Sequence, residues 1–168
     1  MKKIIFYAVM VIASLGLTSC IIEKDDYDGT ELTVGDELPT FELEMNDGKI
    51  LTRDSLQGKE SMIVFFNTDC PDCRKELPVL QIFWERYREY VAMVCISREE
   101  KSDKIAKYWK ENRLTLPYSA QENRTIYNLF ARTSIPRIYI ADRNLIITRV
   151  YTDNPLATLE QLETDYGF

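Results

Sequence analysis

A buried strand that leads directly into two cysteines and a helix is the feature that most constrains this chain. Residues 61–67 form a near-continuous apolar run, which is typical of a central strand covered on both faces. Cys70 and Cys73 follow in the sequence CPDC, and residues 71–90 then carry apolar side chains at spacings of three and four. The sequence therefore predicts two thiols in the first turn of a helix, which Pro78 should kink.

The position of the first cysteine at a helix start favours a specific chemistry. A thiol at a helix N-terminus lies beside unpaired backbone N–H groups and the positive end of the helix dipole, and both favour the thiolate. The thiolate is the attacking species in thiol–disulfide exchange. We therefore expect Cys70 to be the accessible nucleophile, and Cys73, one turn deeper, to be shielded and to resolve a mixed disulfide.

The composition excludes several other kinds of site. The 168 residues include four cysteines and no histidine, so a Cys–His or Ser–His nucleophile pair is impossible. A zinc site would need two ligands besides the CPDC cysteines, and only Cys20 and Cys95, the latter in a predicted core strand, remain. A peroxiredoxin-like cysteine would be preceded by a proline and a threonine where this chain has Ile63 and Asn67. We predict no metal and no cofactor.

The charge balance also limits the partners. The chain has 27 acidic against 21 basic residues and no basic stripe, so we expect no nucleic-acid partner. Its length suits one domain of ordinary size.

Residues 1–19 are predicted to be an export signal and not part of the fold. A short positive start precedes an apolar run over residues 4–17, which is too short to span a bilayer comfortably but suits a signal peptide. The run ends in the sequence LTSC, which resembles a bacterial lipobox. That resemblance implies cleavage before Cys20, lipidation of Cys20 and attachment to the lipid bilayer. An uncleaved short anchor is the alternative.

Residues 20–37 are predicted to form an acidic tether between the lipid and a domain at residues 38–168. Residues 21–37 hold seven acids and one lysine with little periodicity, as in a solvated linker. The acidic start at Glu23 resembles surface-export signals of some Gram-negative lipoproteins. We therefore expect an extracytoplasmic protein in the periplasm or at the outer membrane of a Gram-negative bacterium.

The rest of the chain alternates strands with helices and finishes in a hairpin. Further strands are predicted at residues 41–45, 49–52, 91–97, 137–141 and 145–151, and further helices at 102–113, 123–131 and 156–166. This pattern indicates an α/β fold with a mixed central sheet, helices on both faces and an N-terminal β-hairpin.

Several segments together resemble the TlpA/ResA branch of thioredoxin-like proteins. Residues 62–78 combine the strand, the CxxC, a basic residue, a glutamate and a proline in the order typical of that branch. Residues 38–59 look like its N-terminal addition, and residues 133–136 look like its cis-proline loop. The resemblance covers residues 38–168 and implies a thioredoxin-like three-layer α/β fold and thiol–disulfide oxidoreductase activity.

The resemblance also implies roles for individual residues. Cys70 is expected to be the nucleophile and Cys73 the resolving thiol, while Glu76 is expected to sit near both and help move protons. A simpler interpretation of Glu76 is an acid favoured by the helix dipole. The expected substrate-binding residues are those beside the cysteines and at the cis-proline: Pro71, Asp72, Ile135 and Pro136.

Two positions depart from the family pattern. Asp69 precedes the first cysteine where an aromatic residue is usual, and Arg137 follows Pro136 where a small polar residue is common. Both are expected on the substrate face, and they leave open which partner is served.

We expect the site to reduce disulfides of envelope proteins with electrons from a membrane donor protein. Strong oxidants stabilise the thiolate, whereas Asp69 and Asp72 flank Cys70 and offset the helix N-terminus. Two rival interpretations are a binding or scaffold lipoprotein without redox turnover and a disulfide isomerase. An isomerase normally needs a dimerisation region, and residues 21–37 are too short and acidic for one, so we expect a monomer.

Overall fold

The strand before the cysteines lies at the centre of a five-stranded mixed sheet. The computed structural model describes residues 31–168, so the predicted signal peptide and Cys20 lie outside the described residues. The strands are β1 (Glu42–Glu44), β2 (Ile50–Thr52), β3 (Glu60–Phe66), β4 (Val91–Ser97), β5 (Tyr118–Ser119), β6 (Arg137–Ala141) and β7 (Ile147–Tyr151). The helices are α1 (Pro71–Tyr87), α2 (Ser102–Asn112), α3 (Leu159–Tyr166) and the 3-10 helices η1 (Arg53–Leu56) and η2 (Tyr127–Leu129).

The sheet has the strand order β5-β4-β3-β6-β7, with β1 and β2 in a separate antiparallel hairpin. β3 runs parallel to β4 and antiparallel to β6, so the sheet is mixed as predicted. Residues 61–66 of β3 are all buried. A strand that is covered on both faces has a fixed depth and register, and this fixes the place where the cysteines begin.

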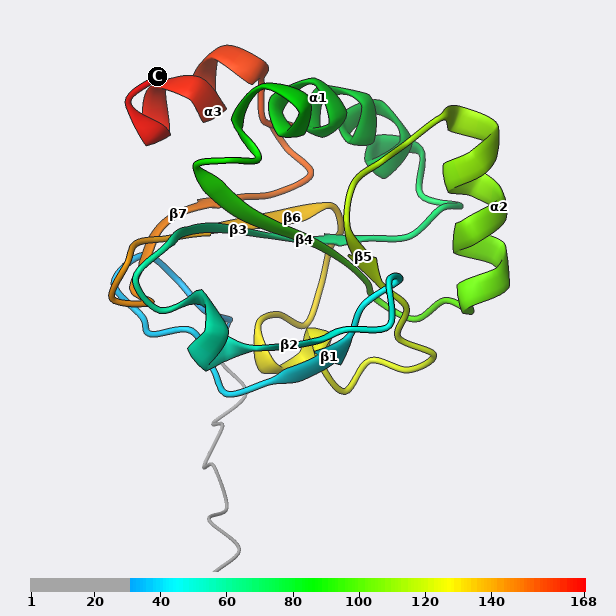
Figure 1. The fold of residues 1–168 in the computed structure, drawn as a ribbon, viewed down its shortest axis with the longest axis horizontal. Helices are drawn as coiled ribbons and strands as arrows, with labels where there is room; N and C mark the ends of the chain where they lie inside the picture. The colour runs from blue at the N-terminus through cyan, green and yellow to red at the C-terminus, as the bar shows by residue number, and fades with distance from the viewer. Residues whose placement is uncertain (1–30) are drawn as a thin grey trace, which may run out of the picture.

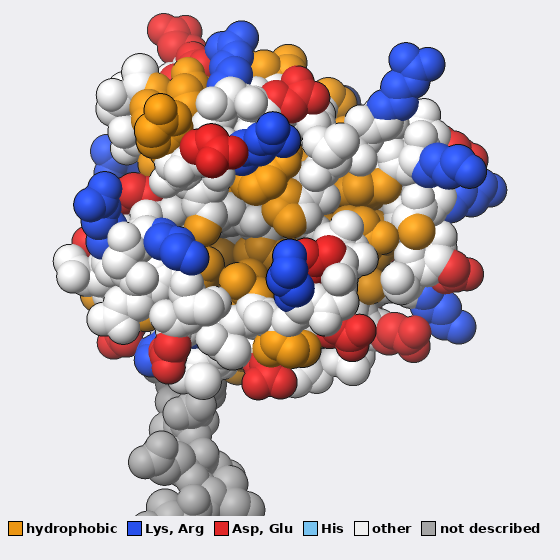
Figure 2. Space-filling model, in the orientation of Figure 1, with side chains coloured by type: hydrophobic (Ala, Val, Ile, Leu, Met, Phe, Trp, Pro, Cys, Tyr) orange, Lys and Arg blue, Asp and Glu red, His pale blue; other side chains and the backbone are white. Residues whose placement is uncertain are grey.

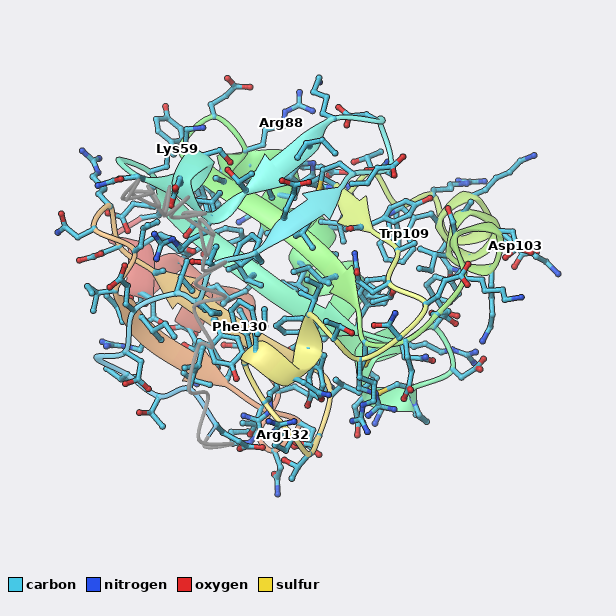
Figure 3. All side chains as sticks on the ribbon, turned by 90° about the horizontal axis from the view of Figure 1, so that it is seen from below. Lys59, Arg88, Asp103, Trp109, Phe130 and Arg132 are labelled. Atoms are coloured by element: carbon cyan, nitrogen blue, oxygen red, sulfur yellow. The ribbon has the colours of Figure 1, made fainter. Side chains whose placement is uncertain are left out.

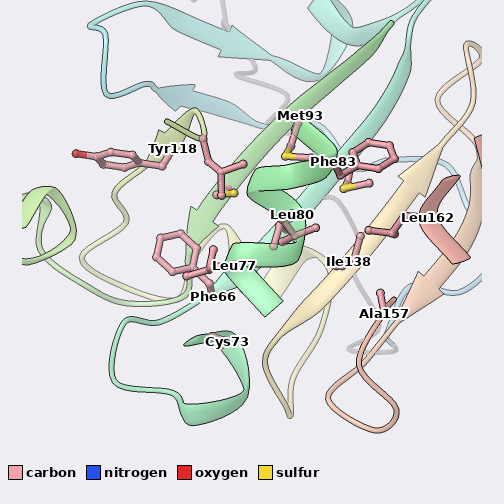
Figure 4. Packing of buried hydrophobic residues seen from close by; sticks show 14 of the residues in the cluster. Phe66, Cys73, Leu77, Leu80, Phe83, Met93, Tyr118, Ile138, Ala157 and Leu162 are labelled. Carbon is pink, nitrogen blue, oxygen red and sulfur yellow. The ribbon is translucent and has the colours of Figure 1, made fainter. Parts of the chain in front are cut away.

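One face of the sheet is covered by α1 and α3, which lie above it in Figure 1, and α2 lies beside the β5 end of the sheet. The apolar stripe of α1 supplies Leu77, Leu80 and Phe83 to this core, and α2 and α3 add further buried side chains. α1 continues through Pro78 and ends at Tyr87, a little before the predicted end. In Figure 4 the first turn of α1 lies at one end of this core.

The other face is covered by the β1–β2 hairpin together with η1 and η2 (Figure 1). Figure 3 shows Phe130, directly after η2, beneath the sheet. It packs against Phe65 with ring centroids 4.9 Å apart. Aromatic and aliphatic side chains from the added hairpin and from β3 thus form a second core.

The predicted helix at residues 123–131 is wrong in extent. Only the single turn of η2 is helical there, and the sequence analysis missed the short strand β5. The Asn123 side chain accepts the Thr125 backbone N–H at 2.9 Å, which holds the chain in a turn. Tyr127 is buried and donates its hydroxyl to the Ser134 carbonyl at 2.8 Å, so its environment is set by the following loop and the core.

The predicted tether is also too long, because residues 31–37 belong to the folded domain. The Leu32 N–H donates to the Phe130 carbonyl at 2.9 Å, and the Gly35 N–H donates to the Ile147 carbonyl at 2.8 Å. Residues 35–36 of this segment pair their backbone with β7 at the sheet edge, while the side chains of Thr33 and Glu37 are exposed. The composition of the segment therefore resembles that of a linker although its backbone is paired.

No helix in the described part of the chain is long and apolar enough to cross a bilayer. Figure 2 shows acidic and basic side chains interspersed over the face seen in Figure 1.

We expect a fragment of residues 31–168 to be more stable than one of residues 38–168. Three backbone hydrogen bonds join residues 32–36 to the rest of the fold. At about 1 kcal/mol each, their loss should lower the free energy of unfolding by about 3 kcal/mol. Urea denaturation of both fragments measures the difference, and equal midpoints would show that the segment is a tether after all.

Candidate active site

The two CPDC cysteines lie where β3 passes into α1. Cys70 is the N-cap of α1, and its Sγ accepts the Cys73 backbone N–H at 3.2 Å. The same sulfur lies 3.6 Å from the Ile135 carbonyl oxygen, to which the protonated thiol donates. Cys70 therefore has a donor that supports its thiolate and an acceptor that suits its thiol.

The two thiols differ sharply in exposure. Cys70 is partly exposed, whereas the Cys73 side chain is fully buried, and neither is in a disulfide. Burial raises the pKa of the Cys73 thiol far above its usual range, and its hydrogen bond with Cys70 adds to the effect. The predicted order of an accessible first and a shielded second cysteine is confirmed. Cys95 lies in the core, also as expected, and burial raises its pKa too.

Glu76 lies one turn beyond Cys73 on α1 and is only 2% exposed. Its Oε1 accepts the Ala157 backbone N–H at 2.8 Å. Burial raises the pKa of Glu76 to about 7, although the hydrogen bond from Ala157 opposes the shift. The Glu76 charge also acts to raise the pKa of Cys73, which shows that the two groups are close enough to interact. A carboxylate that titrates near neutral pH beside a buried thiol is suited to accept its proton.

The predicted cis-proline loop faces the cysteines. The Ile135–Pro136 peptide bond is cis, which confirms the prediction, and Pro136 is buried. The structure thus brings Ile135 next to Cys70, although they are 65 residues apart. A second cis bond, Asn154–Pro155, was not predicted, although an Asn–Pro pair is a turn signal.

The first turn of α1 presents the other two expected substrate-binding residues. Pro71 occupies the first helical position and is exposed, and Asp72 is partly exposed. Both are on the surface beside Cys70.

The acids that flank Cys70 are each paired with a cation. Asp69 lies 2.5 Å from the Lys104 Nζ and 3.6 Å from an Arg74 nitrogen, and Asp72 lies 2.8 Å from the Lys75 Nζ. From the sequence, Arg74 and Lys75 were expected to lie farther along the helix and to offset only part of the repulsion between these acids and a thiolate. That repulsion is therefore smaller than expected, because each negative charge is offset locally.

A buried acid that the sequence analysis missed holds the turn before Cys70. Glu100, in the β4–α2 loop, accepts the Thr68 backbone N–H at 2.9 Å and the Thr68 hydroxyl at 2.5 Å. Its remaining partner is Lys104, at 2.7 Å, which also pairs with Asp69. The only available sequence signal was an acid placed just after a buried strand.

Arg137 was expected on the substrate face, but the structure buries it behind the cis-proline loop. Its guanidinium is 6% exposed, pairs with Glu31 at 2.7 Å and donates to the Ser134 carbonyl at 3.2 Å. Arg137, the residue that departs from the family pattern at this position, therefore contacts and supports the cis-proline loop. The described residues contain no group of three or more Cys, Asp or Glu side chains arranged to hold a metal ion.

Comparison with known proteins agrees with this arrangement. The model of the AhpC/TSA family matches residues 34–150. The chain belongs to the AhpC/TSA family. This AhpC/TSA protein is 22% identical over 165 residues to the thiol-disulfide oxidoreductase ResA of Bacillus cereus, covering 96% of this chain and 94% of ResA. It is 26% identical to ResA of Oceanobacillus iheyensis, with 93% of this chain and 83% of that protein covered.

Solved structures show the same fold. A Bacteroides thetaiotaomicron protein that was provisionally assigned as a protein disulfide isomerase matches with a TM-score of 0.76 and 26% identity, covering 81% of this chain and 89% of that one. StoA from Bacillus subtilis matches with a TM-score of 0.66 and 21% identity, covering 76% and 96%. The fold is thioredoxin-like, and this AhpC/TSA protein is a thiol–disulfide oxidoreductase.

We expect brief alkylation of the reduced protein to label Cys70 at least about tenfold faster than Cys73, because only an exposed thiolate reacts readily. Iodoacetamide labelling followed by peptide mass spectrometry measures both rates, and urea-unfolded protein is the control in which they converge. Equal labelling in the folded protein would contradict the assignment of roles.

Proposed function

We propose that this chain reduces disulfide bonds of proteins in the bacterial envelope, with Cys70 as nucleophile and Cys73 as resolving thiol. The observation that carries the proposal is the pairing of a partly exposed N-cap thiol with a fully buried second thiol in the same helical turn. An exposed first sulfur can meet a partner's disulfide, while the buried one reacts only within the protein.

The reaction balances as a two-electron exchange. The Cys70 thiolate attacks one sulfur of the substrate disulfide, the substrate S–S bond breaks, and its leaving sulfur takes a proton. Cys73 then gives its proton to Glu76 and attacks the Cys70 sulfur, which breaks the mixed disulfide. The departing second substrate sulfur takes up the proton that Glu76 received and leaves as a thiol. The substrate is reduced and Cys70–Cys73 becomes a disulfide. A membrane donor protein must supply two electrons and two protons to restore the dithiol.

The surface around Cys70 supports a protein substrate. The cis-proline loop places the Ile135 carbonyl 3.6 Å from the Cys70 sulfur, where an extended chain that carries a disulfide would pass. Pro71 and Asp72 border the same sulfur on α1. Extended chains add to exposed backbone groups through main-chain hydrogen bonds, so we assign substrate binding to Ile135, Pro136, Pro71 and Asp72.

The cellular place follows from the N-terminal sequence. We propose that residues 1–19 are a signal peptide and that Cys20 carries lipid, which holds a monomeric domain at a membrane outside the cytoplasm of a Gram-negative bacterium. The alternative function is a binding or scaffold lipoprotein without redox turnover. It would need the same lipid anchor but no thiol–disulfide exchange. It gives no reason for an acid with a pKa of about 7 beneath the buried thiol.

Cys20→Ala should release the protein from the membrane, because several acyl chains anchor stably whereas one gives marginal binding. Fractionation of cells followed by detergent phase partitioning measures the release. Lys24→Arg, outside the LTSC motif, is the control, and partitioning of Cys20→Ala with the membrane would contradict the anchor.

The Cys70/Cys73 pair should have a reduction potential below about −180 mV and nearer thioredoxin, at about −270 mV, than DsbA, at about −120 mV. No histidine stands between the cysteines to stabilise the thiolate. Because Asp69 and Asp72 are paired with cations, replacing both by Asn should raise the potential by less than about 30 mV.

Equilibration with glutathione or dithiothreitol buffers, followed by alkylation, measures these potentials. A wild-type value above about −180 mV would contradict the reductant and favour an isomerase or an oxidant.

The resolving step should quicken as pH rises through about 7, where Glu76 becomes able to accept a proton. Glu76→Gln should slow it by about a hundredfold at pH 7.5 and remove that rise. Stopped-flow decay of a Cys70 mixed disulfide measures the step, with Glu85→Gln, the same change at an exposed position of α1, as the control. A Glu76→Gln profile like that of the wild type would remove the proton-transfer role.

Protein stability gives a second test of Glu76. Its pKa is about 7 in the fold against 4.5 ordinarily, so between these values the folded chain keeps a proton that the unfolded chain has released. Stability should therefore fall as pH rises through this window, by up to about 1.4 kcal/mol per pH unit. Urea denaturation between pH 4.5 and 8 should show a shallower fall in Glu76→Gln.

A further inference from the structure

A carboxylate from the first described residue of the chain is bound to the cis-proline loop. One oxygen of Glu31 accepts the Thr133 hydroxyl at 2.7 Å and the Arg132 backbone N–H at 3.2 Å. The other oxygen pairs with the Arg137 guanidinium at 2.7 Å. Figure 3 shows Arg132 at this end of the molecule, beyond Phe130. We call Glu31, Thr133 and Arg137 the Glu31 cluster.

The Glu31 cluster fixes the backbone that precedes the cis-proline. Arg137 donates to the Thr133 hydroxyl at 3.1 Å and to the Ser134 carbonyl at 3.2 Å. The Ser134 carbonyl also accepts the Tyr127 hydroxyl at 2.8 Å. The next residue is Ile135, whose own carbonyl faces the Cys70 sulfur. A chain of direct contacts therefore joins Glu31 to the backbone beside the reactive thiol.

The charges in this cluster depend on each other. The Arg137 side chain is almost fully buried, and a buried guanidinium requires a charged partner. Burial opposes the charge of Glu31, but hydrogen bonds from Thr133 and Arg132 and the charge of Arg137 leave its pKa below the ordinary value. Glu31 is thus ionised at neutral pH, where it balances Arg137.

We propose that Glu31 is a positioning residue for protein substrates: it holds residues 133–136 in the form that pairs with an extended chain beside Cys70. The inference rests on the proposed function and adds to it a requirement for the segment that leads from the N-terminus. A protein substrate needs the ordered loop because its backbone must dock there. A small disulfide needs only to reach the Cys70 sulfur, so it should not depend on Glu31.

The test compares two substrates in single-turnover reactions of the pre-reduced full chain. Insulin is the protein disulfide, and 5,5′-dithiobis(2-nitrobenzoic acid) is the small one. Glu31→Gln should slow the reaction with insulin by about fivefold, as expected for the loss of one charged contact, through weaker binding and not a slower step at saturation. Its rate with the small disulfide should stay within about twofold of the wild type.

The matched control is Asp36→Asn, the same change in the same segment. The Asp36 carboxylate accepts hydrogen bonds from Thr33, in its own turn, and should not affect either substrate. Thr133→Val cuts the Glu31 cluster from the loop side and should reproduce the loss with insulin. The double variant with Glu31→Gln should lose less than the sum of the two single effects, because the residues act as one unit. Thermal melts of each variant identify any general loss of folding.

Two results would overturn the inference: equal loss with both substrates in folded variants, or Glu31→Gln behaving like Asp36→Asn. The proposed function has its own control in Cys70→Ser. If the wild type reduces insulin no faster than Cys70→Ser, the proposed function fails and the inference fails with it. If the wild type reduces insulin faster than Cys70→Ser, but Glu31→Gln reacts at the same rate as Asp36→Asn, the proposed function stands and the inference about Glu31 alone is wrong.

Discussion

The hydrogen bond from the Cys73 backbone N–H to the Cys70 sulfur caps α1 at the point where the chain leaves the sheet, and the arrangement of the site depends on where this helix begins. Because β3 is buried on both faces, the chain leaves the sheet at a fixed point, and Cys70 caps α1 there. The first turn of α1 then directs Cys73 into the core, where its thiol is fully buried. The difference in exposure between the two cysteines is therefore a consequence of where one helix begins.

Because Cys73 is buried, its reaction depends on the groups around it. A thiol in an apolar environment does not ionise at neutral pH, so resolution of a mixed disulfide needs a nearby acceptor. Glu76 is buried on the same helix and has a pKa of about 7, so burial both suppresses the Cys73 thiolate and suits Glu76 to the acceptor role proposed for it. On the exposed side, ion pairs neutralise Asp69 and Asp72 and leave the net charge near Cys70 small.

The sequence predicted the parts of the fold that depend on neighbouring residues. The buried strand, the CPDC turn and the apolar stripe of α1 are local patterns, and the structure confirms them. The cis bond before Pro136 was predicted only through the family resemblance. Arg137 was misplaced because its partner is 106 residues away in the chain, and the pairing of Lys104 with Asp69 spans 35 residues. Periodicity carries no information on such contacts.

Residues 31–37 show a related limit. Their composition is that of a linker. They are ordered because they pair with the edge strand β7, which comes from a distant part of the chain. Likewise, residues 123–131 have a helical apolar pattern, but burial of Tyr127 and side-chain bonds within the turn restrict the helix to one turn. In both cases tertiary contacts overrode the local preference.

The buried pair of Arg137 and Glu31 has an evolutionary consequence. Loss of Glu31 leaves the buried Arg137 charge without its partner, whereas replacing both by uncharged residues can be nearly neutral. Substitutions at these two positions should therefore be correlated across descendants of this protein, although 106 residues separate them in the sequence. Thr33 and Val34 in the same segment have exposed side chains and are free to vary independently.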